Sequence, residues 1–134
     1  MQLLIHNERT LSEIQKDFNA MFPYLKLEFF SKLHGSGEPS SLKFKLPEQK
    51  KIGDVRKSAK EETLIIVPDM TVADLEQTLG DQLALGVQVF RKSGGVWLET
   101  IFTDTWTLAQ QNEQGEFLGT DIEPDIPENP LDRN

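Results

Sequence analysis

The 134-residue chain contains no cysteine. This absence excludes disulfide bonds, thiolate metal ligands and a cysteine nucleophile. Histidine is scarce as well, and His6 and His34 show neither the HxH nor the HxxxH spacing that is typical of a metal site. No serine stands in the nucleophile-elbow pattern of hydrolases. We therefore expect no metal, no cofactor and no catalytic residue.

Long apolar runs are also lacking. No stretch approaches the roughly 18 apolar residues that a membrane span needs, and residues 1–5 lack the basic start of a secretory signal. The sequence therefore predicts a cytoplasmic protein that does not contact a membrane. Its length of 134 residues and its apolar fraction of 37% are enough for one domain with its own core.

Negative charge is concentrated at the C-terminal end. Seven acidic residues and one arginine give residues 113–134 a charge of −6, which leaves −2 of the total of −8 for residues 1–112. Pro124, Pro127 and Pro130 lie among these acids. Such a composition cannot bury enough apolar surface to offset the entropy lost on ordering. We expect one globular domain at 1–118 and a disordered acidic tail at 119–134.

Helix starts recur in the globular part. Thr10 and Thr71 each stand before an apolar residue and have an acid three residues later, Glu13 and Asp74. This spacing is typical of a helix N-cap, and with Glu13 it forms a capping box. Thr107 begins a third helix in the same way, with glutamine at the third position. A fourth start, at residue 51, has no capping hydroxyl.

Strand patterns surround these helix starts in the same order each time. The expected strands share apolar residues that alternate or run together, and they lie at 3–5, 25–32, 42–46, 64–67, 85–92 and 96–102. Together with the helices they give the order β-α-β-β-α twice, in repeat units of about 1–60 and 61–117.

This order predicts an α+β fold. We expect a two-layer sandwich in which both units share one six-stranded mixed sheet, with the helices on one face. Strands 3–5 and 25–32 would then be parallel and joined by a right-handed crossover. A second interpretation stays open, because residues 1–67 alone read β-α-β-β-α-β, which is a ferredoxin-like order.

Two segments carry a resemblance to known proteins. They are Val-Gln-Val-Phe-Arg-Lys-Ser-Gly-Gly-Val-Trp-Leu-Glu-Thr and Thr-Leu-Ala-Gln-Gln-Asn, both between Thr71 and Gly115. With the first forty residues, this stretch resembles a family of small bacterial α+β proteins that is itself uncharacterised. The resemblance implies no activity.

A basic stretch at residues 43–60 is one candidate binding segment. Seven basic residues stand against two acidic ones, a local charge of +5, and such a patch can meet nucleic-acid phosphates. However, the rest of the domain is slightly negative, and neither Phe30 nor Phe90 stands in an RNA-recognition pattern. We expect any such binding to be weak and to vanish between about 50 and 200 mM salt.

An aromatic set is the stronger candidate. Alternation along the strands turns one apolar set toward the helices: Leu27, Phe29, Val87 and Val89. It sends the other set to the opposite face: Phe30, Phe90, Trp97 and Ile101. Exposed apolar clusters often mark contact surfaces, and aromatic residues are favoured at interface centres. A curled sheet, the tail or Phe117 would be alternative covers for these side chains.

The leading hypothesis is a non-enzymatic protein-interaction module that uses this aromatic face to bind an unknown protein or a second copy of itself. The first alternative is a weak nucleic-acid binder that uses residues 43–60. The second is an enzyme whose site forms only in three dimensions and cannot be read from sequence.

Overall fold

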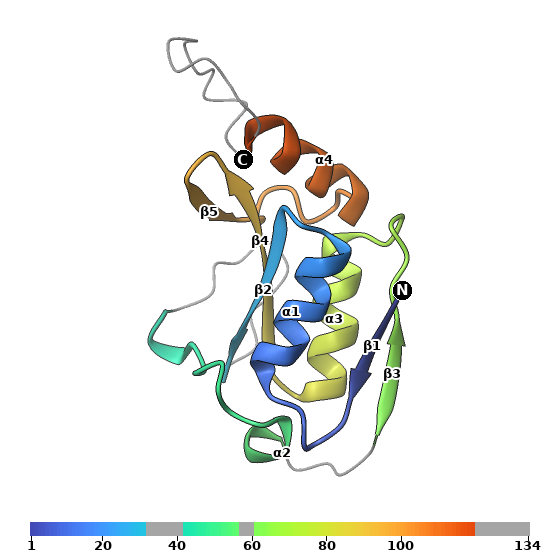
Figure 1. The fold of residues 1–134 in the computed structure, drawn as a ribbon, viewed down its shortest axis with the longest axis vertical. Helices are drawn as coiled ribbons and strands as arrows, with labels where there is room; N and C mark the ends of the chain where they lie inside the picture. Colours follow the sequence, from blue (N-terminus) through green and yellow to red (C-terminus); the bar gives the residue numbers. More distant parts are fainter. Residues whose placement is uncertain (32–41, 57–60, 120–134) are drawn as a thin grey trace.

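The computed structural model describes residues 1–31, 42–56 and 61–119 (Figure 1). Along the chain the elements are β1 (Gln2–Ile5), α1 (Leu11–Met21), β2 (Leu25–Phe30), the 3-10 turn η1 (Leu42–Phe44), α2 (Ile52–Val55), β3 (Glu62–Ile65), α3 (Val72–Leu83), β4 (Gly86–Ser93), β5 (Val96–Glu99) and α4 (Leu108–Gly119). The expected α+β class is confirmed. The expected tail at 119–134 lies outside the described residues, apart from Gly119 at the end of α4.

The strands form two antiparallel sheets, with the orders β1-β3 and β2-β4-β5. The expected six-stranded mixed sheet is therefore wrong, and so is the parallel crossover from β1 to β2. The reason is the position of the helices. In Figure 1, α1 and α3 lie between the β1-β3 pair and the larger sheet, and one buried core joins all of these elements. Both sides of the helix pair are thus covered by strands.

The central strands follow the predicted alternation. Leu27 faces Val89 across the β2-β4 ladder and Phe29 faces Val87. All four side chains belong to the buried core beneath α1 and α3. The period of two therefore assigned the inner face of the larger sheet correctly.

The expected strands at 42–46 and 96–102 differ most from the prediction. Residues 42–46 form the turn η1 and then a single bridge from Lys45 to Phe30, so they touch the edge of β2 without forming a strand. β5 ends at Glu99. The amide and hydroxyl of Thr100 both donate to the carbonyl of Val89, but the N–H of Val89 donates to Glu76 Oε2 at 2.8 Å, so the ladder does not continue. The chain then turns, which leaves Phe102 88% exposed.

The helix N-caps are confirmed. The N–H of Glu13 donates to Thr10 Oγ1 at 3.2 Å, and the N–H of Thr10 donates back to Glu13 Oε1 at 3.1 Å. This second bond is the main reason why the pKa of Glu13 lies below its ordinary value. The N–H of Asp74 donates to Thr71 Oγ1 at 3.1 Å. The description of the whole chain as a tandem repeat stays a prediction.

Replacing Thr10 or Thr71 by alanine should lower the free energy of unfolding by about 1 kcal/mol each, because each threonine satisfies an amide at a helix start. Urea titration followed by circular dichroism measures this loss. Thr105→Ala, in an exposed turn, is the control and should change stability by less than about 0.5 kcal/mol. Equal stability of all three variants and the parent would contradict the capping role.

No helix among the described residues is long and apolar enough to cross a membrane.

Candidate interaction surfaces

The predicted aromatic set is divided by the structure. Phe30 is only 1% exposed, so its expected exposure is not found. Phe90 and Trp97 lie on the outer face of the larger sheet and are half-buried. Ile101 is also half-buried but lies in the turn after β5, beyond the strand where it was expected. The structure therefore brings together Phe90 and Trp97, and it removes Phe30 from the accessible surface.

Lysine side chains cover the two rings that remain. The Nζ of Lys26 lies 5.4 Å from the ring centre of Phe90 and 5.0 Å from that of Trp97. The Nζ of Lys92 lies 5.9 Å from Trp97. Lys26 also pairs with Glu28 at 3.4 Å. Cation–π and ion-pair contacts of this kind occupy the faces that a partner would need, so this surface is more polar than the sequence suggests.

The basic segment is largely engaged inside the protein. Lys45 pairs with Glu28 at 3.1 Å, and Lys51 pairs with Glu8 at 3.2 Å. Arg56 is buried, and it donates to the side chain of Asn7 and to the carbonyl of Gln82. Lys57 and Lys60 lie outside the described residues. Fewer basic side chains at 43–56 are therefore free to bind nucleic-acid phosphates than the charge of +5 for residues 43–60 suggests.

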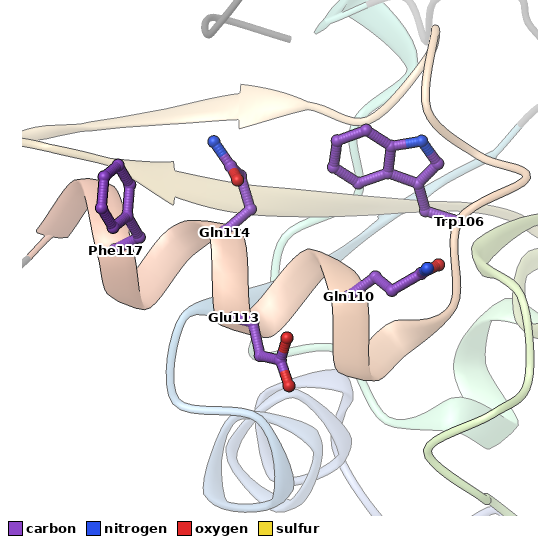
Figure 2. Close-up of a pocket in the computed structure, with 5 residues that line it drawn as sticks. All are labelled: Trp106, Gln110, Glu113, Gln114 and Phe117. Atoms are coloured by element: carbon purple, nitrogen blue, oxygen red, sulfur yellow. The ribbon is translucent and has the colours of Figure 1, made fainter.

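A different surface lies along α4. A hollow of about 480 Å³ is lined by one residue of the turn before α4 and four residues of α4: Trp106, Gln110, Glu113, Gln114 and Phe117. Figure 2 shows the rings of Trp106 and Phe117 at its two ends, with Gln114 between them. Phe117 is 68% exposed. The hollow thus has an apolar group at each end and amide groups in its middle.

The position of α4 follows from its other face. The N–H of Gln110 donates to Thr107 Oγ1, and the N–H of Thr107 donates back to Gln110 Oε1, so the helix begins with a reciprocal cap. Asn112 accepts a bond from the N–H of Tyr24 at 2.9 Å. Gly115 lies directly against Tyr24 and has no room for a Cβ atom. Together with the close approach of Gly115 to Arg91 of β4, these contacts fix α4 against the start of β2 and against β4, and they turn the lining residues of the hollow outward.

A buried arginine supports the end of the hollow at Trp106. Arg91 is fully buried, donates to Gln111 Oε1 at 3.0 Å and lies 5.8 Å from the ring centre of Trp106. Gln111 in turn donates to the carbonyl and hydroxyl of Thr103 at 2.7 Å. Burial lowers the pKa of Arg91 from its ordinary value. Arg91 therefore links the indole of Trp106 to the buried bonds of Gln111.

A third surface is the outer face of the β1-β3 pair. Its apolar members are each about half exposed: Leu4, Ile65 and Val67. The inward-facing residues alternate with them and enter the core, for example Leu3 and Leu64. This face carries no charged side chain at the outward positions between Gln2 and Ile5 or between Thr63 and Ile65.

Nothing among the described residues groups three or more His, Asp or Glu side chains at metal-binding distance. The glycine turn at 93–95 behaves as a hairpin turn, with Gly94 at a φ of 60°. The other glycine turn, with His34, lies outside the described residues.

Sequence reasoning missed Trp106, Phe117 and the β1-β3 face. Gln110, Glu113, Gln114 and Phe117 have the spacing i, i+3, i+4 and i+7, which places them on one side of α4, and Trp106 lies just before that helix. The sequence contains this helical spacing, but polar residues interrupt the apolar ones, so no apolar stripe stands out. The predicted membership of the uncharacterised bacterial family remains an expectation, since comparison with protein-family models, curated proteins and solved structures finds no match.

Proposed function

We propose that this protein is a non-enzymatic protein-interaction module and that the hollow on α4 receives a segment of its partner. The observation that carries the proposal is the pair of aromatic rings at the two ends of the hollow, Trp106 in the turn before α4 and Phe117 on the outward face of α4. Aromatic side chains at the ends of a groove are typical anchors for the apolar residues of a bound peptide.

Charge indicates which kind of partner fits. α4 carries Glu113 and Glu116 and no lysine or arginine. Both carboxylates are exposed, and Glu113 lines the hollow. A segment with apolar residues and at least one basic residue complements this surface, because opposite charges speed association and reject acidic competitors.

The predicted sheet face remains a second candidate surface for the same function, through Phe90, Trp97 and Ile101. Trp97 lines a smaller hollow of about 330 Å³ beside α1. The lysines over its rings make it the less favourable of the two surfaces, because a partner would have to displace Lys26 and Lys92.

Selection from a random peptide library, with the parent protein as bait, tests the proposal. We expect enriched peptides with an apolar anchor and a basic residue. Phe117→Glu should weaken their binding about tenfold or more, because it replaces an anchor ring by a charge, and loss of such an anchor exceeds about 1.4 kcal/mol. Fluorescence anisotropy with labelled peptides gives the dissociation constants.

Phe102→Glu is the matched control, because Phe102 is also an exposed phenylalanine but does not line the hollow. Its peptide affinity should equal that of the parent. The double variant Phe90→Ser/Trp97→Ser tests the sheet face in the same assay. If the double variant lost peptide binding and Phe117→Glu bound like the parent, the peptide site would be on the sheet face instead.

A further inference from the structure

The β1-β3 pair has two outer edges, and their hydrogen bonds follow from the register. Leu3 pairs with Leu64, and the N–H of Ile66 donates to the carbonyl of Met1 at 2.8 Å. In an antiparallel ladder, alternate residues direct both backbone groups to the partner strand. Glu62, Leu64 and Ile66 therefore point to β1. The N–H and C=O groups of Thr63 and Ile65 point away from it.

The two edges differ in how they are covered. On the β1 side, the carbonyl of Leu4 accepts a bond from Arg9 Nη1 at 2.9 Å, and Arg9 is held by Asp17 at 2.8 Å. On the β3 side, no residue in the described part of the chain bonds to the outward backbone groups of Thr63 or Ile65. Figure 1 shows β3 as the outermost element at its side of the molecule.

Edge strands in monomeric proteins are usually protected by their short length, an outward charge, a proline or a covering segment. The short strand Glu62–Ile65 has no proline, and its two outward side chains are uncharged, Thr63 and Ile65. Main-chain groups of this kind pair most simply with another extended strand.

The β3 edge is complementary to itself. A two-fold axis at Leu64 would place Thr63 opposite Ile65 of a second copy, and Ile65 opposite Thr63 of that copy. Four N–H···O=C bonds then form in the antiparallel pattern. The same register sets Glu61 against Val67 of the second copy, so no carboxylates oppose each other. The exposed apolar residues of both copies would form one continuous face over four strands.

We propose that the protein self-associates through β3, as a two-fold dimer with the sheet order β1-β3-β3-β1. The pairing joins only one short strand from each copy. The interface is therefore small, and the dimer exchanges with monomer. This inference does not use the hollow on α4, so either proposal can fail without the other.

Sedimentation equilibrium from about 1 to about 500 µM tests the dimer, since small interfaces dissociate in such a range. We expect a concentration-dependent rise from 15.2 kDa toward twice that mass. Ile65→Pro should weaken dimerisation about tenfold or more, because it removes a donor from two symmetry-related bonds. The fold should survive, because proline is tolerated where an edge N–H faces outward. Ile65→Lys, which keeps the donor but adds an edge charge, should weaken the dimer as well.

Leu4→Lys is the control, because Leu4 lies on the same outer face but on β1, at the position whose carbonyl accepts a bond from Arg9. It should dimerise like the parent, and so should Phe117→Glu. Hydrogen exchange adds a direct readout, since the amides of Thr63 and Ile65 should gain protection as the concentration rises. A protein that stays monomeric throughout, or a dimer that Ile65→Pro and Ile65→Lys leave intact, would overturn the proposal.

Discussion

Phe18→Ala is expected to lower the free energy of unfolding by about 3–5 kcal/mol, the usual result of removing a buried aromatic ring. Phe18 lies on α1, is fully buried and contacts the ring of Phe22 with centroids 5.5 Å apart. α1 touches both sheets of the fold, so a cavity at Phe18 weakens both layers at once. The loss includes the transfer of the ring from water and the contacts that the cavity removes.

Urea unfolding of Phe18→Ala against Phe102→Ala gives the measurement. Phe102 is 88% exposed, so its replacement should change stability by less than about 0.5 kcal/mol. If both variants lost the same stability, the exposure of the turn after β5 would be wrong. If neither variant lost stability, α1 would not lie between the two sheets as described.

Local patterns predicted the local structure. The capping residues Thr10, Thr71 and Thr107 begin helices because their bonds involve residues only three positions away. The inner face of β2 and β4 follows from a period of two, which the chain carries in the sequence itself. Apolar residues also alternate along 42–46, but a segment with this pattern forms a strand only where a partner strand pairs with it. The backbone of residues 42–46 pairs with β2 at a single bridge, from Lys45 to Phe30.

The division into two sheets is not readable from the sequence, because strand pairing depends on contacts between distant residues. β1 pairs with β3 across about sixty residues of chain, and no local pattern records that choice. The aromatic set failed in part for the same reason. Alternation places Phe30 on the outer face correctly relative to Phe29, but it does not show what covers that face. Phe30 is buried there beside the bridge to Lys45.

The hollow on α4 depends on one close approach that sequence alone does not reveal. Gly115 is inside a helix, where glycine is usually unfavourable by about 1 kcal/mol relative to alanine. A Cβ atom at this position would lie 2.7 Å from Tyr24 Cβ and 3.2 Å from the carbonyl oxygen of Tyr24. Tyr24 cannot move aside easily. Its N–H donates to Asn112 and its carbonyl accepts from the N–H of Lys92.

Gly115→Ala should therefore lower the free energy of unfolding by about 1–3 kcal/mol, although alanine is the better helix former, because overpacking outweighs the gain in helix propensity. Gly95→Ala is the control, since a Cβ there meets nothing within 4 Å, and it should be close to neutral. Urea titration compares the two variants. Because the added methyl must push α4 away from Tyr24, Gly115→Ala should also weaken peptide binding at the hollow between Trp106 and Phe117, whereas Gly95→Ala should not. A more stable Gly115→Ala variant would show that α4 does not approach β2 and β4 as closely as described, and the geometry of the hollow would have to be revised with it.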